Sequence, residues 1–237
     1  MTERLEDATA VILAGGLGTR LRSRLVDRPK VLAPVHGRPY LAYLLEQLAS
    51  TGIRHSVLLT GYLADQIHST FGNRYAGLCL TYSREPSPLG TAGALRRALP
   101  HLSSPTILLL NGDSYCGVSL PDFWEFHHHC SADFSLVLTA MQDCSRYGRI
   151  RVGSDGRVLG FEEKSQAGGA GWVNAGIYLL NRSLIEQIPA DGPVSLEREL
   201  CPVWAANKRC FGFLCQTSFL DIGTPESYAQ ADAFFTC

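Results

Sequence analysis

A short apolar strand that runs directly into a glycine-rich turn is the feature that most constrains the fold of this chain. Residues 10–14 read Ala-Val-Ile-Leu-Ala, and Gly-Gly-Leu-Gly-Thr-Arg follows at 15–20 without a spacer. An unbroken apolar run of this length is typical of a strand buried on both faces. Glycines directly after such a strand let the backbone approach a ligand closely and direct N–H groups at anionic oxygens. The turn therefore predicts a phosphate-binding loop, with a glycine turn that holds no ligand as the alternative.

The two commonest phosphate loops do not describe this turn. A Walker A loop places Gly-Lys-Ser/Thr after four spacer residues, and that triplet is absent. The dinucleotide fingerprint GxGxxG begins correctly at Gly16 and Gly18, but Leu21 stands where the third glycine belongs. An acid would also be expected at the end of the second strand about 20 residues on, whereas the next strand-like run starts near Val57. The loop is thus expected to bind phosphate in another way.

Strand-like and helix-like segments alternate through the first half of the chain. Apolar runs predict strands at 10–14, 57–60, 78–82 and 106–110. Helical spacing predicts helices at 39–48, 64–71 and 92–99, with a further helix starting at 120–122. This alternation predicts an α/β fold with a Rossmann-like, mostly parallel sheet flanked by helices. Ligands of such sheets bind at the carboxyl ends of the strands, where the glycine turn and Asn-Gly-Asp at 111–113 both fall.

The pattern changes after about residue 145. Residues 147–152 and 157–161 flank Gly-Ser-Asp-Gly at 153–156, which predicts a β-hairpin with an Asp-Gly turn. A strand at 173–180 and helices at 195–206 and 225–234 follow. No linker or shift in composition separates the halves, so we expect a single domain over 1–237. Its two halves would be about 1–145 and 146–237, with the hairpin extending over the site.

Charge and hydropathy exclude several classes of protein. The 21 Lys and Arg nearly balance the 22 Asp and Glu, and this net charge of −1 argues against a general nucleic-acid binder. No apolar run approaches the roughly 18 residues that a membrane span needs. The start, MTERLED, lacks the basic and apolar stretches of a signal peptide. We therefore expect a cytoplasmic protein with no membrane contact.

Neither the cysteines nor the histidine run has the spacing of a metal site. The eight cysteines include no CxxC pair, and without a secretion signal they are expected to remain reduced core or surface thiols. The run His127-His128-His129 lies on a predicted helix, where three consecutive side chains point in three directions and cannot bind one ion. These residues are expected to be structural.

Two lysines and two aspartates are the candidate chemical groups. Only three of the 21 basic residues are lysine, and Lys30 follows the glycine loop closely while Lys164 ends a predicted strand. Asp113 and Asp221 each stand between an apolar strand and a glycine turn, where a carboxylate is costly unless it is paired or binds metal. Mg²⁺ in phosphate chemistry takes one or two carboxylates together with substrate oxygens. Alternatively, each aspartate forms a turn or caps a helix, as Asp221 could for a helix at Pro225.

Together these segments carry a resemblance to a known family. Seven ordered motifs span essentially the whole chain: LAGGLGTRLR at 13–22, RPK at 28–30, PLGTAGA at 88–94, NGDS at 111–114, FEEK at 161–164, VNAGIY at 173–178 and FLDIGT at 219–224. This pattern resembles the sugar-1-phosphate nucleotidyltransferases. Within them it is most similar to the short guanylyltransferases that act on D-glycero-D-manno-heptose 1-phosphate or mannose 1-phosphate. The resemblance implies a nucleotide-diphospho-sugar transferase fold, without the β-helix of hexapeptide repeats that longer relatives carry.

The resemblance also implies a role for each matching residue. The nucleotide-binding half would hold the nucleotide with Leu13, Ala14, Gly15, Gly16, Gly18, Thr19 and Arg20, and the base with Pro88, Leu89, Gly90 and Thr91. Arg20 and Lys30 would act on the phosphates, and Asp113 and Asp221 would bind Mg²⁺ as the cofactor. The sugar-phosphate-binding half would use Tyr147, Gly148, Glu163, Lys164 and Asn174.

The implied reaction makes an NDP-sugar and pyrophosphate from an NTP and a sugar 1-phosphate. The first expectation is GTP with D-glycero-D-manno-heptose 1-phosphate, giving GDP-heptose for a surface polysaccharide. Mannose 1-phosphate guanylylation, and thymidylyl, uridylyl or cytidylyl transfer on the same fold, remain alternatives. A non-catalytic sensor of nucleotides or sugar phosphates is the alternative of a different class. The partners would be these small molecules and no nucleic acid; whether the protein forms a homodimer stays open.

Overall fold

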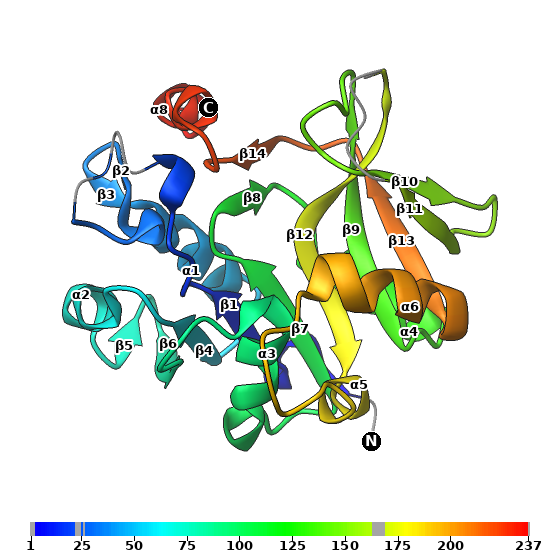
Figure 1. Ribbon diagram of the computed structural model, residues 1–237, viewed down its shortest axis with the longest axis horizontal. Coiled ribbons are helices and arrows are strands. Elements are labelled where there is room, and N and C mark those ends of the chain that lie inside the picture. The colour runs from blue at the N-terminus through cyan, green and yellow to red at the C-terminus, as the bar shows by residue number, and fades with distance from the viewer. Residues whose placement is uncertain (1–2, 22–24, 26, 163–168, 237) are drawn as a thin grey trace.

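The computed structural model describes residues 3–21, 25, 27–162 and 169–236, and within them one mixed sheet runs through the middle of the molecule (Figure 1). Its centre is parallel, in the order β7-β1-β4-β6. These four strands are β1 (Thr9–Leu13), β4 (His55–Thr60), β6 (Leu78–Arg84) and β7 (Thr106–Asn111). All four were predicted from apolar runs, within one or two residues at most ends. Their carboxyl ends meet at one edge, as a doubly wound fold requires.

The other half of the sheet is built around a long strand, β12 (Gly171–Asn181), that lies antiparallel to β7. The predicted hairpin of β10 (Arg149–Val152) and β11 (Val158–Glu162) pairs with one side of β12. On the outer part of the sheet, β9 (Phe134–Met141) pairs with β12 and in parallel with β13 (Cys210–Cys215). Strands β9 and β13 were not predicted from the sequence.

Helices cover both faces of the sheet, because strand residues alternate between two cores. Ala10 and Ile12 of β1 pack into one core, and Val11 between them packs into the other. The first core takes α1 (Tyr40–Ser50), α2 (Ala64–Phe71) and α4 (Leu120–His129). The second takes α3 (Gly90–Arg97), α5 (Arg182–Glu186) and α6 (Cys201–Asn207), which lie in front of the sheet in Figure 1. The result is the predicted three-layer α/β architecture.

Two predicted helices are broken. The helix expected over 195–206 is a π-helical turn over Leu196–Leu200 followed by α6, and Pro202 falls in the first turn of α6. The helix expected over 225–234 consists of α7 (Pro225–Tyr228) and α8 (Ala231–Phe234). The N-cap of α7 is Thr224, whose hydroxyl accepts from the backbone N–H of Ser227. Asp221 is therefore not the cap of this helix.

Short elements complete the chain. The strand β14 (Phe219–Asp221) pairs antiparallel with β8 (Ser114–Cys116) in a separate two-stranded sheet. Small pairs also join β2 (Pro34–Val35) to β3 (Arg38–Pro39) and β5 (Arg74–Tyr75) to β6. Single 3₁₀ turns cover 5–7, 19–21, 30–32 and 99–101. Of the described helices, none has the length and apolar character that a membrane crossing requires.

Candidate active site

The glycine loop follows β1 at the carboxyl edge of the parallel strands. Neighbouring strand ends approach it closely, because the Gly112 N–H donates to the carbonyl of Leu13 at 3.0 Å. A Cβ on Gly112 would lie 2.4 Å from that carbonyl oxygen, so only glycine fits there. Beside the loop is a cavity of about 340 Å³, called the loop cavity below. It is lined by the predicted residues Leu13, Ala14, Gly15, Gly16, Lys30, Pro88, Gly90, Thr91 and Asp113.

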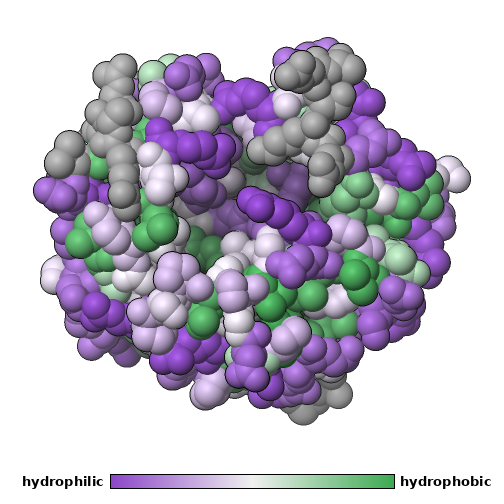
Figure 2. Space-filling model, in the orientation of Figure 1, coloured by the Kyte–Doolittle hydropathy of each residue, from purple (hydrophilic) through white to green (hydrophobic). Residues whose placement is uncertain are grey.

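A wider cavity of about 720 Å³ opens next to the loop cavity and is called the wide cavity below. Figure 2 shows this face hollowed near its centre, with hydrophilic residues around the opening. Its wall includes the predicted residues Arg20, Asp113, Tyr147, Gly148, Asn174 and Asp221. The loop 146–148 reaches the wide cavity, whereas the described residues 149–162 of the hairpin line neither cavity. Five residues line both cavities: Gly90, Thr91, Asn111, Asp113 and Glu197.

Three predicted residues lie elsewhere. Gly18 adopts a positive φ of 59° and lines a small hollow beside Lys30. Thr19 begins the 3₁₀ turn 19–21 and is outside the walls of both cavities. Leu89 donates its backbone N–H to Glu85 at 3.0 Å. Glu163 and Lys164 lie outside the described residues.

One lysine joins the two aspartates at the junction of the cavities. The Lys30 ammonium donates to Asp113 Oδ2 at 2.6 Å and lies 3.9 Å from Asp221 Oδ1. The lysine side chain is only 11% exposed, whereas the Asp113 side chain is 38% exposed and lines both cavities. The small sheet of β8 and β14 creates the geometry, because Asp221 pairs with Ser114, the residue after Asp113.

The two aspartates differ in acidity. Burial opposes ionisation of Asp113, but the charge and hydrogen bond of Lys30 outweigh it and the pKa of Asp113 is lowered. Burial, and then the negative charge of Asp113, raise the pKa of Asp221. Lys30, the Gly223 N–H and Arg20 lower the pKa of Asp221 only in part, so an additional cation would further stabilise its charged form.

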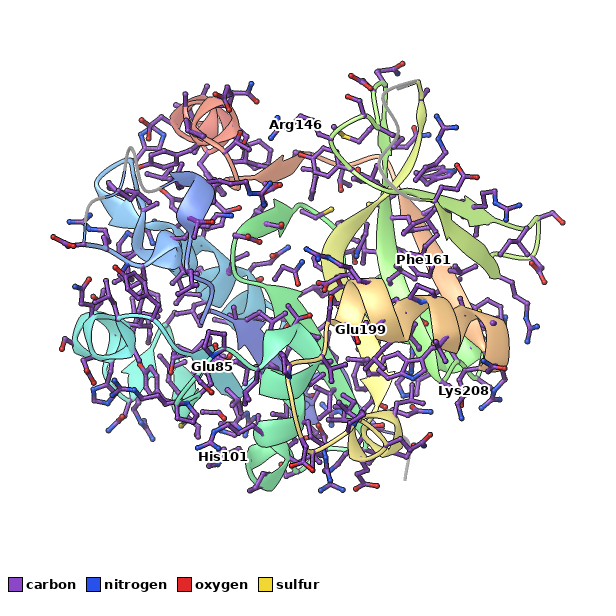
Figure 3. All side chains as sticks on the ribbon, viewed as in Figure 1. Glu85, His101, Arg146, Phe161, Glu199 and Lys208 are labelled. Carbon is purple, nitrogen blue, oxygen red and sulfur yellow. The ribbon has the colours of Figure 1, made fainter. Side chains whose placement is uncertain are left out.

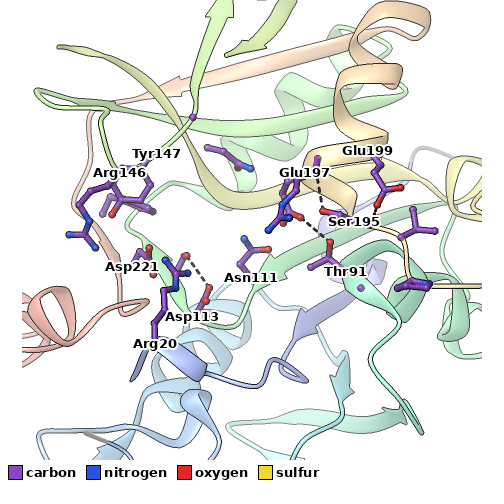
Figure 4. A pocket seen from close by; sticks show the side chains of 18 residues that line it. Arg20, Thr91, Asn111, Asp113, Arg146, Tyr147, Ser195, Glu197, Glu199 and Asp221 are labelled. Carbon is purple, nitrogen blue, oxygen red and sulfur yellow. Dashed lines mark hydrogen bonds between the residues drawn. The ribbon is translucent and has the colours of Figure 1, made fainter. Parts of the chain in front are cut away.

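Cationic and aromatic side chains border the wide cavity. Arg20 and Arg146 lie on the same side as the two aspartates (Figure 4). Arg146 donates to the Thr224 hydroxyl at 3.1 Å, and its guanidinium lies 5.8 Å from the ring centroid of Tyr147. These side chains make one wall of the wide cavity suitable for an anionic ligand.

Several polar residues of the site were not predicted from the sequence, among them Glu85, Asn111, Arg146 and Glu197. Glu85 follows the carboxyl end of β6 and lines the loop cavity, away from Arg146 in the loop before β10 (Figure 3). The rule that ligands bind at strand ends could have found it, since the strand predicted at 78–82 ends close by. Asn111 and Arg146 each lie within two residues of a predicted site residue. No sequence pattern marked Glu197 as a site residue, since it lies within a segment that was interpreted as an ordinary helix.

The arrangement matches a known family. The family model described as nucleotidyl transferase matches residues 9–236. The chain belongs to this family. Members of the family are enzymes, so the two joined cavities form the candidate active site of a nucleotidyltransferase.

Relatives of named activity cover nearly the whole chain. It is 36% identical to the D-glycero-alpha-D-manno-heptose 1-phosphate guanylyltransferase of Aneurinibacillus thermoaerophilus, over 94% of this chain and 96% of the relative. It is 35% identical to the mannose-1-phosphate guanylyltransferase of Mycobacterium tuberculosis, over 94% of this chain but 63% of the relative. The crystal structure of HddC from Yersinia pseudotuberculosis complexed with GMP-PN superposes with a TM-score of 0.86 at 32% identity, covering 97% of this chain and 100% of that one. These similarities confirm the predicted family and fold.

Proposed function

We propose that this protein transfers a guanylyl group from GTP to a sugar 1-phosphate, forming a GDP-sugar and pyrophosphate. D-glycero-α-D-manno-heptose 1-phosphate is the first candidate for the sugar phosphate, and mannose 1-phosphate is the second. The observation that carries the proposal is the position of Asp113, which lines both cavities beside Lys30 and Asp221. Substrates bound in the two cavities would meet there. The heptose phosphate is placed first because the relative with that named activity is 36% identical over 94% of this chain, against 35% over the same share for the mannose phosphate enzyme.

A carboxylate in the loop cavity supports guanine as the base. Glu85 Oε2 accepts the Leu89 N–H, and the side chain faces the loop cavity beside Pro88. Guanine presents two adjacent donors, its N1–H and its exocyclic amino group, which one carboxylate can accept together. Thymine and uracil place carbonyl oxygens on both sides of their single N–H, and these oxygens would be repelled by the carboxylate. Burial raises the pKa of Glu85, and two donors from guanine would stabilise its charged form.

The residues at the junction fit a divalent cation. Asp113 and Asp221 supply two carboxylates, and the raised pKa of Asp221 reflects burial and its repulsion by Asp113. Two carboxylates suit Mg²⁺, an ion that keeps water and phosphate oxygens as further ligands. When bound by these two residues, Mg²⁺ would neutralise charge on the nucleotide phosphates.

The remaining chemistry follows from charge and position. A sugar 1-phosphate is already ionised near neutral pH, because its second pKa is about 6, so its oxygen needs no catalytic base to attack the α-phosphorus. The glycine loop would direct backbone N–H groups at the nucleotide phosphates. Lys30 would hold a phosphate oxygen at the reacting centre, and Arg20 would bind the triphosphate. Bringing two anions together and stabilising the charge that develops would supply most of the rate.

The wide cavity would hold the sugar phosphate. Tyr147, Gly148 and Asn174 lie in its wall, and we propose that they contact the sugar. Glu163 and Lys164 are proposed to bind the sugar and its phosphate, respectively, as the family resemblance implies. Arg146 adds a second cation for that phosphate on the wall shared with Tyr147.

A pyrophosphate-release assay across nucleoside triphosphates and sugar 1-phosphates tests this function. GTP with the heptose or mannose 1-phosphate should give the highest kcat/KM. A grid in which dTTP with glucose 1-phosphate exceeds it tenfold would overturn the guanylyl assignment. Tight nucleotide binding without turnover on any pair would instead support a sensor.

A further inference from the structure

Glu197 lies between the two cavities and uses its two carboxylate oxygens on different partners. Oε2 accepts the Thr91 hydroxyl at 2.9 Å, and Oε1 accepts the Tyr178 hydroxyl at 3.3 Å. Thr91 belongs to the first turn of α3, which follows the loop assigned to the base. Figure 4 shows Glu197 directed across the boundary toward Thr91. A single carboxylate therefore connects the nucleotide side to the interior of the sheet.

The connection continues to the proposed sugar side. Tyr178 is fully buried on β12, and its hydroxyl oxygen accepts from Asn174 Nδ2 at 2.8 Å. The other end of the Asn174 amide is also held, because its Oδ1 accepts the Gly176 N–H at 2.9 Å. Thr91 and Glu197, which line both cavities, are thus joined through Tyr178 to Asn174, which lines only the wide cavity.

The backbone on the nucleotide side is hydrogen-bonded to the segment that leads to Glu197. The Val194 N–H donates to the Leu89 carbonyl at 2.8 Å, and the Val194 carbonyl accepts from Ala92 at 2.9 Å. The Thr91 hydroxyl also accepts the Leu196 N–H at 2.7 Å. At Gly90 a Cβ would lie 2.4 Å from the Val194 carbonyl oxygen, so the two segments are in direct backbone contact. A displacement of the loop before α3 would therefore be transmitted to Glu197.

We propose that Glu197 is a positioning residue that couples occupation of the loop cavity to binding of the sugar phosphate in the wide cavity. Contacts of the nucleotide with the loop would fix Thr91, and Thr91 would fix the Glu197 carboxylate. That carboxylate would then hold Tyr178 and Asn174 in position to contact the sugar. Such coupling is reciprocal, so each substrate raises the affinity of the other by the same factor, and typical factors are about 5 to 150. The inference rests on the proposed function, because it takes the two cavities as the two substrate sites.

The test measures the coupling factor in Glu197→Gln. The amide replaces one acceptor oxygen with a donor, so only one of the two hydroxyl donors, Thr91 or Tyr178, keeps an acceptor. The matched control is Glu186→Gln, because the Glu186 carboxylate pairs with Arg182 on α5, outside the walls of both cavities. Calorimetry would give the Kd of mannose 1-phosphate with and without α,β-methylene-GTP, and the ratio of the two is the coupling factor.

Wild type should show a factor of about five or more, Glu197→Gln a factor near one, and Glu186→Gln a factor within twofold of wild type. A second pair of variants, at Thr91, tests the coupling without changing Glu197. Thr91→Ser keeps the hydroxyl and should keep the coupling, whereas Thr91→Val should lose it. A merely structural role would lower the melting temperature of Glu197→Gln while leaving the coupling factor unchanged.

The outcomes separate the two proposals. If the assay grid selects another substrate pair, the same ratio is measured with that pair and its methylene analogue. No turnover on any pair overturns the proposed function and this inference with it. Turnover in wild type, with a coupling factor that is near one or is unchanged by Glu197→Gln, overturns the inference alone.

Discussion

Asp221 and Ser114 are paired residues in the short antiparallel sheet of β14 and β8. This pairing places Asp221 next to Asp113, and the Ile222 N–H donates to the Asp113 carbonyl at 2.9 Å. Both carboxylates then approach one ammonium group, that of Lys30. The position of the two acids therefore depends on backbone hydrogen bonds between distant segments, which hold it more rigidly than a loop would.

The first prediction concerns these acids as a metal pair. Asp113→Asn and Asp221→Asn should each lower kcat by at least about 10²–10³, because an amide is a poor ligand for Mg²⁺. Asp221→Asn should keep or raise the melting temperature, since it removes a buried charge that Asp113 repels, and Thr224 rather than Asp221 caps α7. Rate and melting temperature should be measured on the same sample, with Mg²⁺ titrated from zero.

A result that would contradict this prediction is normal turnover of Asp221→Asn with a lowered melting temperature. It would mean that Asp221 supports the fold through its bond to the Gly223 N–H and does not bind metal.

The second prediction separates the two lysines of the proposed site. Lys30→Ala should chiefly lower kcat, by about 10²–10³, because it removes a donor from a shielded reacting centre. Lys164→Ala should chiefly raise the KM of the sugar 1-phosphate. Lys208→Ala is the control, since this third lysine lies at the end of α6 away from both cavities (Figure 3). Kinetics of Lys30→Ala and Lys164→Ala that match this control would remove both lysines from the site.

Local patterns made most of the fold predictable. The runs that became β1, β4 and β7 are mostly apolar and buried on both faces, so each can be recognised without knowing its neighbouring strands. Some helix ends were also predictable from the sequence. Gly72, for example, directly follows α2 and adopts a positive φ of 59°, which favours glycine. The antiparallel pairing of β12 with β7 was not predictable, because register between distant strands is a tertiary property. The break between α7 and α8 was likewise invisible in a continuous helical pattern.

Site residues were predictable where several of them stand together in one short segment of the sequence. The glycine loop and Asp113 stand at strand ends, and a rule about ligand position identifies them directly. Glu197 could not be identified in this way, because its proposed role comes from its hydrogen bonds to Thr91 and Tyr178. These partners lie 106 and 19 positions away along the chain. No pattern along the sequence encodes such a contact. The pairing of Lys30 with Asp113, 83 positions away, could likewise be seen only in the fold.

The third prediction is a loss of stability at acid pH through His127. This side chain is 2% exposed and its Nδ1 lies 2.9 Å from the Ser135 hydroxyl. Burial, and then the charge of His128, lower its pKa to about 4. The neutral form is thus favoured in the folded state, so its contribution is complete above the unfolded pKa near 6.5. That contribution falls as the pH drops from about 6.5 to 4, on the order of 3 kcal/mol in all.

Urea unfolding of wild type and His127→Asn between pH 4 and pH 7.5 measures this effect. The variant should lack most of the drop in unfolding free energy between pH 6.5 and 4 that distinguishes wild type. His129→Asn is the control, because His129 is exposed on the same helix. If the two variants show the same pH dependence, the buried histidine is not responsible.

The fourth prediction is that Glu85 sets the choice of base. In Glu85→Gln, one oxygen can still accept from guanine, but the second position becomes an N–H donor that faces a guanine donor. The same amide can accept from the N3–H of uracil and donate to its O4, so it suits a pyrimidine better than the carboxylate does.

Losing a hydrogen bond to a charged group costs about 1.5–3 kcal/mol, so kcat/KM for GTP should fall by about 10- to 100-fold in Glu85→Gln. The ratio of GTP to UTP efficiency should fall at least as far, and the KM of the sugar 1-phosphate should change little. Glu46→Gln is a suitable control, since Glu46 pairs with Arg38 on the outer surface of α1. An unchanged GTP to UTP ratio in Glu85→Gln would show that the carboxylate shapes the loop through Leu89 and does not read the base.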